Sequence, residues 1–415
     1  MYKISENKKQ LIYLATIQAG NAIIPLFAYP YLLFRMGADK FAPLATLEAA
    51  ALIVLIISLY SFDVTGIKKI NHAKTISDNL IKKTYYTIIY ARILIFSSLT
   101  ILLLIPIYFL EENLRLASFA WLLLPLGVVL QSTYFYQATS NNFPLALFVI
   151  IPRIGSLVCV FVYANENTSL ILASSLISLS YLISGASSFL YILTTIGFSS
   201  PKILIFRSFS FIIKGKELFI GNISVMLYRG SNIFLLNSLD SSAIAISAYA
   251  VSEKYIKMLQ ALTFPLTQIY SVRFTREVIR KKVDSYTFRK LLWSNTKSQV
   301  LVAATLCTLF LLTCFISSTK LNEIISNKSI ELTVIMIPSI LFGIINYMYG
   351  TIGFSLINLE KEYAKIILIT GIVIILISAT LIKFYSSNGA AIAYCLGEII
   401  LSVLFVIRIY KFKKI

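Results

Sequence analysis

Long apolar segments follow one another along almost the whole chain, from residue 11 to within a few residues of the C-terminus. Each is about 20 residues long, the length of a helix that crosses the hydrocarbon core of a bilayer. Hydrophobic residues make up 58% of the sequence, and the mean hydropathy is +0.82. Such a pattern predicts an all-α polytopic membrane protein, whose function lies in a pathway between its helices.

The segments predict about twelve transmembrane helices, since lipid offers the backbone no hydrogen-bond partners and continuous helices satisfy it internally. The predicted spans are residues 11–34, 41–62, 85–110, 116–139, 144–163, 169–197, 217–237, 242–270, 291–317, 330–357, 363–383 and 388–408. An even number of spans places both termini on the same side of the membrane.

The chain is strongly basic, with 37 Lys and Arg, 18 Asp and Glu, and a formal net charge of +19. In a soluble protein this excess would suggest a nucleic-acid partner. Here roughly 25 of the basic residues lie in alternate segments outside the spans, and cytoplasmic loops are the ones that retain Lys and Arg. The charge therefore predicts cytoplasmic termini and no nucleic-acid partner.

A basic segment divides the predicted helices into two groups of about six, an arrangement typical of transporters with internal repeats. The second helices of the two halves can be aligned, with Ala45 opposite Ala250 and Glu48 opposite Glu253. We therefore expect two pseudo-symmetric six-helix lobes. The expected parts are an N-terminal lobe at 1–200, a cytoplasmic basic linker at 201–216 and a C-terminal lobe at 217–415.

Several charged residues lie within or at the ends of apolar spans, where each costs about 2.5–3.5 kcal/mol on insertion scales and needs a reason. The acidic ones are Glu48, Glu253, Glu398 and Asp63. The basic ones are Arg92, Arg153, Arg229, Lys254 and Lys257. Because guanidinium and ammonium groups bind phosphate and carboxylate, the deep basic residues suit an anionic substrate.

A structural interpretation of these charges is also open. Glu253 and Lys257 are four residues apart on one helix face and can form a fixed salt bridge. Arg92 lies near the end of its span and can anchor the helix at the membrane surface. Arg153 and Arg229 have no acidic residue within helical reach, so each either takes a partner from another helix or faces a hydrated cavity.

Prolines mark candidate moving parts of the predicted helices. Pro25 and Pro30 interrupt the first span beside Asn21, and Pro265 lies inside the eighth. A proline frees a backbone carbonyl and permits a bend, which is either a static kink or part of a gate.

Motifs for catalysis and cofactor binding are absent from the sequence. It contains no phosphate-binding loop, zinc-protease motif or glycine-rich dinucleotide turn. The single histidine, His72, has no cysteine or acidic residue at ligand spacing. We therefore predict no metal site, no cofactor and no enzymatic activity, and transport is the function that remains.

Two stretches resemble a known family of membrane proteins. Residues 21–41 (NAIIPLFAYPYLLFRMGADKF) are similar to the first helix and following turn of bacterial polysaccharide-export flippases. Residues 249–254 (YAVSEK), continued by 265–268 (PLTQ) and a basic loop, form the second match. In length and helix number, nearly the whole chain resembles the Wzx-type O-antigen flippases of the multidrug/oligosaccharidyl-lipid/polysaccharide (MOP) exporter superfamily.

This resemblance implies two six-helix lobes around a central cavity that opens alternately to the two faces of the bacterial inner membrane. The implied substrate is an oligosaccharide repeat unit on undecaprenyl diphosphate, with membrane lipid, a polysaccharide polymerase and a chain-length regulator as further partners. The residues we assign to a cationic cavity are Arg92, Arg153, Arg229, Lys254 and Lys257. The candidates for ion coupling are Glu48, Asp63 and Glu253, and those for gating are Asn21, Pro25, Pro30 and Pro265.

Three alternatives compete with this prediction. A cation-coupled multidrug exporter of the same superfamily would be expected to place acidic residues in its cavity, whereas the deep charges here are mainly basic. A membrane-embedded polysaccharide polymerase or ligase would need a sizeable outer loop, and the outer loops here are short. A scaffold without transport activity would leave the deep charges and the apparent repeat unexplained.

Overall fold

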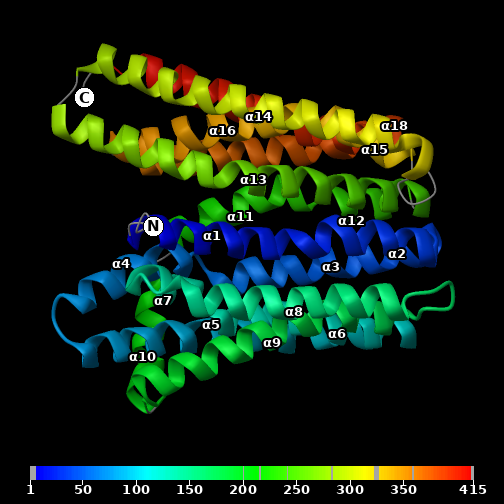
Figure 1. Ribbon diagram of the computed structural model, residues 1–415, viewed down its shortest axis with the longest axis horizontal. Coiled ribbons are helices and arrows are strands. Elements are labelled where there is room, and N and C mark those ends of the chain that lie inside the picture. The colour runs from blue at the N-terminus through cyan, green and yellow to red at the C-terminus, as the bar shows by residue number, and fades with distance from the viewer. Residues whose placement is uncertain are drawn as a thin grey trace, which may run out of the picture. The chain divides into compact units, whose positions relative to one another are not determined.

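The computed structural model describes residues 6–199, 201–214, 216–240, 242–281, 284–321, 327–357 and 359–412. All regular elements of these residues are helical. The chain forms two compact units, Met1–Ile223 and Ser224–Ile415, here called the N-unit and the C-unit. In each unit the long helices lie side by side along a common direction (Figure 1).

The N-unit is built mainly from long membrane-length helices. Its elements are α1 (Glu6–Ile23), the π-helix η1 (Ile24–Ala28), α2 (Tyr29–Met36), α3 (Ala38–Leu59), α4 (Phe62–Lys74), α5 (Asp78–Tyr108), α6 (Glu112–Gln131), α7 (Thr133–Thr139), α8 (Asn142–Tyr163), α9 (Leu170–Ile196) and α10 (Pro201–Lys214). Helix α11 (Lys216–Gly230) crosses from the N-unit into the C-unit.

The C-unit combines very long helices with short, interrupted ones. Its elements are α12 (Asn232–Leu239), α13 (Ala243–Lys281), α14 (Ser285–Leu321), α15 (Asn327–Met336), α16 (Pro338–Ile345), the π-helix η2 (Asn346–Gly353), α17 (Phe354–Leu356) and α18 (Glu360–Lys411).

Nine segments of the described residues are long and apolar enough to cross a bilayer. The six in the N-unit overlap the first six predicted spans, and those in the C-unit overlap the ninth to the twelfth. The predicted seventh and eighth spans are missing from this set. The seventh is divided near Ser231, between α11 and α12, and the eighth carries three charged residues within α13.

Helix α18 is a folded-back pair of helices. Its backbone leaves the helical region at Ser386 (φ 51°, ψ −132°). The two ends of α18 meet, because Arg408 Nη2 lies 2.6 Å from Glu362 Oε1. This hairpin accounts for two of the predicted spans, 363–383 and 388–408.

The prediction of continuous helices is wrong at several places. The fourth span ends as a helix at Gln131 and restarts at Thr133, because Ser132 adopts a left-handed conformation (φ 51°, ψ 47°). The first span passes through η1, which contains Pro25, and the tenth passes through η2. In η1, Pro25 lacks the amide hydrogen that the α-helical pattern requires. A π-helical turn, with hydrogen bonds between residues five apart, is a local departure from that pattern.

The segment expected to be a linker, 201–216, is largely helical where it is described. Its helix α10 packs on α5, and Ser208 Oγ donates a hydrogen bond of 2.7 Å to the carbonyl oxygen of Thr87. The boundary between the two compact units falls after this segment, within α11.

The cores of both units contain buried aromatic residues. In the N-unit, Tyr85, Tyr134 and Phe135 pack with aliphatic residues of α5 and α8. In the C-unit, Phe354 and Phe405 form an edge-to-face pair with ring centroids 5.3 Å apart. These clusters hold the irregular elements α7 and α17 against the long helices.

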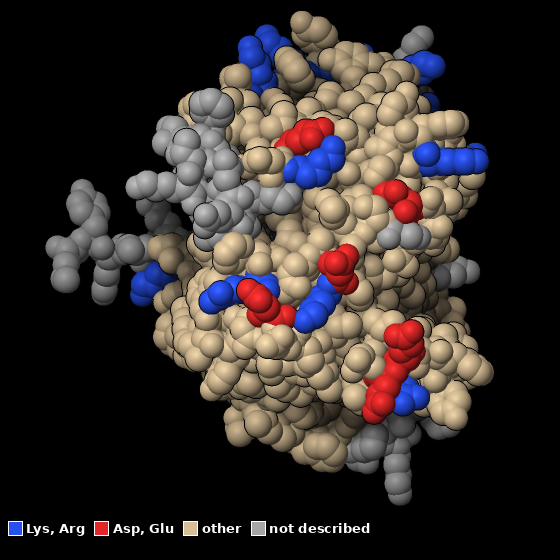
Figure 2. Space-filling model, turned by 90° about the vertical axis from the view of Figure 1, so that its right-hand side faces the viewer, with Lys and Arg blue, Asp and Glu red and all other residues tan. Residues whose placement is uncertain are grey.

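Charged side chains are sparse at one end of the molecule (Figure 2). Several of them lie in groups of opposite sign on a largely uncharged surface. In the C-unit, Lys328 Nζ lies 3.0 Å from Glu331 Oε2, and Asn388 Nδ2 donates to Glu331 Oε1.

Candidate functional site

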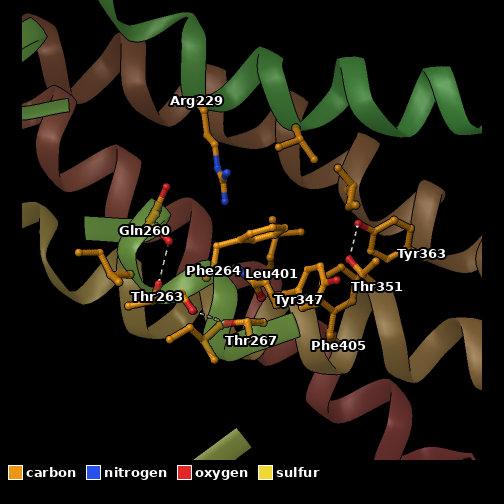
Figure 3. Close-up of a pocket in the computed structure, with 16 residues that line it drawn as sticks. Arg229, Gln260, Thr263, Phe264, Thr267, Tyr347, Thr351, Tyr363, Leu401 and Phe405 are labelled. Carbon is orange, nitrogen blue, oxygen red and sulfur yellow. Dashed lines mark hydrogen bonds between the residues drawn. The ribbon is translucent and has the colours of Figure 1, made fainter. Parts of the chain in front are cut away.

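The C-unit contains a cavity of about 280 Å³, here called the C-cavity, with an arginine directed into it (Figure 3). Helices α11, α13, α16 and α18 and the π-helix η2 line it. Aliphatic side chains and Phe264 and Phe405 supply the apolar part of its wall. Its principal polar lining residues are Arg229, Gln260, Thr263, Thr267, Tyr347 and Tyr363.

Arg229 forms a salt bridge with Glu398, which is on α18. Its Nη2 lies 2.6 Å from Glu398 Oε1, and its Nε donates to the same oxygen at 2.8 Å. The Glu398 side chain is 0% exposed, whereas that of Arg229 is 32% exposed. The arginine therefore has a buried counter-charge on one side and access to the C-cavity on the other.

Asn346 and Ser402 complete the polar environment of Glu398. Asn346 Nδ2 donates to Glu398 Oε2 at 2.7 Å and to the Glu398 carbonyl at 3.0 Å. Ser402 Oγ in turn donates to Asn346 Oδ1 at 2.8 Å. A buried carboxylate is tolerated when it is both paired and hydrogen-bonded, and Glu398 meets both conditions.

Close packing of η2 on α18 positions Asn346. A Cβ atom on Gly350 would lie 2.6 Å from the ring of Phe405, and one on Gly353 would lie 2.7 Å from Ile409. At Gly350 the Phe405 ring leaves no room for a side chain, whereas at Gly353 the nearest atom is the flexible end of Ile409. The contact brings the amide at the start of η2 within reach of Glu398.

The N-unit contains a second cavity, of about 360 Å³. Helices α1, α3, α4, α6, α7 and α9 line it, and it lies at the break between α6 and α7. Non-helical backbone at membrane depth is tolerated where it is buried in protein or lines a cavity. The polar residues that line this cavity are Gln18, Asn21, Asp63, Gln131, Thr133, Tyr134, Gln137 and Tyr181.

Arg92 lies behind this cavity and is paired with one of its lining residues. Its Nη2 lies 2.8 Å from Asp63 Oδ1, and its guanidinium carbon is 4.7 Å from the centre of the Tyr134 ring. The Arg92 side chain is 1% exposed. This position is in the interior of the N-unit, away from the surface location that membrane anchoring requires.

Arg153 takes a similar position behind a second lining tyrosine. Its Nη1 donates to Ser180 Oγ at 2.8 Å, and its guanidinium carbon lies 3.4 Å from the centre of the Tyr181 ring. Tyr181 also interacts electrostatically with Glu48, which is buried on α3. Arg153 therefore contacts a neighbouring helix through a serine and a tyrosine, no salt bridge joins it to an acidic residue within the described residues, and it lies behind the cavity wall.

Glu253 and Lys257 form the salt bridge that their spacing predicts as one alternative, with Nζ 2.8 Å from Oε1. The Glu253 side chain is buried, and Lys257 is 41% exposed. Lys254, also buried, lies next to them on α13. Neither of the two cavities described above has any of these three residues in its wall.

The gating candidates lie at irregular parts of the first span and inside α13. Asn21 lines the N-unit cavity, and Pro25 follows it within η1. Pro30 is in α2, and Pro265 is inside α13. The described residues contain no group of three or more His, Cys, Asp or Glu that could hold a metal ion.

Sequence reasoning did not identify the partner of Glu398 or the roles of Asn346 and Gln131. Arg229 and Glu398 are 169 residues apart, so no local spacing connects them. An amide within an apolar span is the only signal that Asn346 and Gln131 offer, and it does not indicate the partner.

The fold and these two cavities define a multi-pass helical membrane protein, which was compared with known proteins and solved structures. No family model matches the chain. Over 399 residues it is 21% identical to an Escherichia coli (strain K12) protein described as "Putative O-antigen transporter", which covers 96% of this chain and 95% of that protein.

Two solved structures of membrane transport proteins have a similar fold over nearly the whole chain. An inward-facing multidrug resistance MATE family transporter of the MOP superfamily matches with a TM-score of 0.65 at 12% identity, covering 96% of this chain and 98% of that one. The lipid II flippase MurJ in an inward closed conformation matches with a TM-score of 0.62 at 13% identity, covering 96% and 88%. The resemblance found in the sequence is thus confirmed, and the chain has an all-helical polytopic membrane fold.

Proposed function

We propose that this chain is a flippase that moves undecaprenyl-diphosphate-linked oligosaccharide repeat units across the bacterial inner membrane. The units would belong to O-antigen or a related surface polysaccharide, and the movement would proceed by alternating access. The observation that carries this proposal is the similarity to the Escherichia coli protein over 96% of the chain. The transporter fold supports it.

Arg229 is the residue best placed to bind the diphosphate. Its guanidinium is directed into the C-cavity, where Thr263, Thr267 and Tyr347 add hydroxyl groups (Figure 3). A guanidinium offers parallel N–H donors that match the oxygens of a phosphate. Substrate phosphate would compete with Glu398 for Arg229, which links binding to the charge state of the pair.

The other candidates are proposed for supporting roles. Lys254 and Lys257 precede Gln260 and Thr263 on α13, so they could guide an anionic headgroup toward the C-cavity. Arg92 and Arg153 would act through the tyrosines on which they lie.

Three acidic residues are proposed for ion coupling, and one asparagine and three prolines are proposed for gating. Asp63, Glu48 and Glu253 are the candidate ion carriers, since each is an acidic group within or at the end of a span. Asn21, Pro25, Pro30 and Pro265 are the candidate gating residues, since they lie beside or within irregular or proline-containing helix segments.

The proposed topology places both termini in the cytoplasm, with about twelve spans in two pseudo-symmetric lobes. At one end of the N-unit, Lys40 Nζ contacts the Glu166 carbonyl at 2.6 Å, and acidic and basic residues are nearly balanced there. The opposite end carries the basic α4–α5 region, including Lys74 and Lys82. A polysaccharide polymerase and a chain-length regulator would use the product on the periplasmic side.

A liposome assay tests the proposed function. The purified chain is reconstituted with undecaprenyl diphosphate that carries N-acetylglucosamine, and a membrane-impermeant hexosaminidase is added outside. Without protein only the outer-leaflet glycolipid should be cleaved, whereas an active flippase should expose the inner pool as well. Cleavage limited to the outer pool with the wild-type chain contradicts the proposal.

Arg229→Gln should slow the exposure of the inner pool by roughly tenfold or more, because a hydrogen bond to a charged group contributes about 1.5–3 kcal/mol. Arg35→Gln is the matched control, since Arg35 is exposed near the end of α2 and contacts only Tyr31 within the described residues. If Arg229→Gln and Arg35→Gln both flip at the wild-type rate, Arg229 has no part in the mechanism.

A cation-coupled multidrug exporter is the second candidate, and the match to a MATE family transporter favours it. The same proteoliposomes should then expel a lipophilic cationic dye, such as rhodamine 6G, when a Na⁺ or H⁺ gradient is imposed. Dye transport without exposure of glycolipid would replace the first proposal with the second.

A further inference from the structure

The N-unit cavity contains an unusual concentration of side-chain amides, and we call it the amide cavity. Gln18 and Asn21 lie one turn apart on α1, so they share a helix face. Gln131 is the last residue of α6, and Gln137 lies on α7 beyond the break at Ser132. The left-handed Ser132 thus turns the chain so that amides from three helices line one space of about 360 Å³.

These four amides make no hydrogen bond to another protein group within the described residues. Gln131 is the most buried of the four, with 5% of the residue exposed, whereas Gln18 and Asn21 are half-buried and Gln137 is exposed. A buried polar group without a partner costs about 1–3 kcal/mol, so buried amides normally have one. Water or a ligand rich in hydrogen-bonding groups must therefore satisfy the Gln131 amide, and the other three amides line the same space.

The remaining walls are aromatic and aliphatic. Tyr134 and Tyr181 line the amide cavity, and each has an arginine stacked on its ring, Arg92 at 4.7 Å and Arg153 at 3.4 Å. The arginines hold the two rings in place from outside the cavity. Leu52, Leu55 and other aliphatic residues complete the wall.

We propose that the amide cavity binds uncharged sugar rings of the transported glycan through their hydroxyl groups. This inference rests on the proposed function and names a separate subsite for it, distinct from the C-cavity that would take the anionic headgroup. Each amide supplies a carbonyl acceptor and two N–H donors, so one side chain can bind two neighbouring hydroxyls of a pyranose. Fixed tyrosine rings and aliphatic side chains suit the apolar C–H faces of the same rings.

The charges at the cavity favour a sugar over a metal cation. Asp63 is the one carboxylate in the wall, and Arg92 already pairs with it at 2.8 Å. A hard cation requires several oxygen ligands and gains little from a carboxylate that a guanidinium has neutralised. The amide nitrogens, which are donors only, would also oppose a cation.

The test measures binding of three lipids to the purified full chain in nanodiscs. One is bare undecaprenyl diphosphate, and the other two carry a single N-acetylglucosamine and a single galactose. The wild-type chain should bind at least one sugar-bearing lipid more tightly than the bare lipid. Gln131→Leu and Gln18→Leu should each reduce that preference by roughly three- to tenfold, the value of one or two hydrogen bonds, with the affinity for bare lipid unchanged.

Matched controls separate this subsite from a general loss of structure. Gln299→Leu removes a buried amide from α14, which lines neither cavity, and should leave the preference intact. Gln131→Leu should keep a native elution profile, because replacing an amide without a protein partner by an apolar group of similar size is nearly neutral.

The outcomes distinguish this inference from the proposed function on which it rests. If the wild-type chain binds all three lipids with equal affinity, the sugar subsite is wrong and headgroup binding is unaffected. The same conclusion follows if both leucine variants keep the wild-type preference for sugar-bearing lipid. Binding of neither lipid class overturns both proposals. If the leucine variants instead lose binding of ²²Na⁺ and keep the sugar preference, the cavity is a cation site and the inference is wrong.

Discussion

Glu398 shows how a single residue acquires its role from a distant partner. Its side chain is completely buried, and its charge is balanced by Arg229 and hydrogen-bonded by Asn346. Removing one member of a buried pair costs about 3–5 kcal/mol, since the other charge is left without compensation. Removing both is much milder, because no isolated charge remains.

The pair predicts strongly non-additive stabilities. Arg229→Leu should destabilise the chain by about 3 kcal/mol or more, because it isolates a carboxylate that is 0% exposed. Glu398→Leu should cost less, since Arg229 is 32% exposed and can turn toward the C-cavity. The double variant should recover much of the loss, and thermal unfolding of all four proteins in detergent measures the coupling energy.

Additive effects within about 0.5 kcal/mol would contradict this coupling. The double variant also separates a structural from a functional role for the pair. A stable double variant that no longer exposes glycolipid assigns the pair to transport, whereas a stable and active one assigns the pair to folding alone.

At the scale of elements, the contact between α6 and α9 determines where the walls of the amide cavity lie. A Cβ atom on Gly185 would lie 1.9 Å from the carbonyl oxygen of Gly127, and one on Gly127 would lie 2.3 Å from the backbone of Tyr181. Small residues permit such close approach of helices in membranes. Buried serines of α9, such as Ser184 and Ser188, continue the same face.

Gly185→Ala should therefore destabilise the N-unit by about 1–3 kcal/mol, because backbone atoms must move to admit the methyl group. The unfolding midpoint should fall by roughly 2–4 °C per kcal/mol for a unit of this size. Gly155→Ala is the control, since nothing lies within 4 Å of a Cβ atom there and alanine favours the helix. A Gly185→Ala midpoint equal to that of Gly155→Ala would show that α6 and α9 can separate freely.

At the scale of the whole molecule, the distribution of charge predicts orientation in the membrane. The α4–α5 region of the N-unit is basic, whereas the loop that contains Asn167 is not. Basic segments remain in the cytoplasm, so the two regions should lie on opposite sides of the bilayer.

Cysteine labelling tests this orientation. In a variant without the four native cysteines, Asn167→Cys should react with an impermeant maleimide in cells whose outer membrane is permeabilised. Lys74→Cys should react only after the inner membrane is opened. Both positions are exposed in the structure, so accessibility of the side chain is matched. The reverse pattern of labelling would invert the proposed topology.

The sequence indicates some residues of the candidate sites, but it does not show which residues from other helices lie beside them. Asn21 is a candidate because it lies beside two prolines, and Asp63 is a candidate because it is an acidic residue at the end of a span. In the structure both residues line the amide cavity. Gln131 offers only the signal of an amide within an apolar span, because its position in the cavity depends on the left-handed turn at Ser132. Pairing of Glu253 with Lys257 was accessible from spacing, since helical periodicity places them on one face.

The sequence by itself determined that the chain is helical and crosses a membrane repeatedly, because apolar length and backbone hydrogen bonding leave a lipid-embedded segment few alternatives. Short stretches of the sequence, such as residues 21–41, also show its similarity to flippases. Only the tertiary structure decided that Arg229 meets Glu398 and that four amides share one cavity. Those contacts depend on helix breaks and on glycine-mediated packing between residues far apart in the chain, which hydropathy and local spacing do not encode.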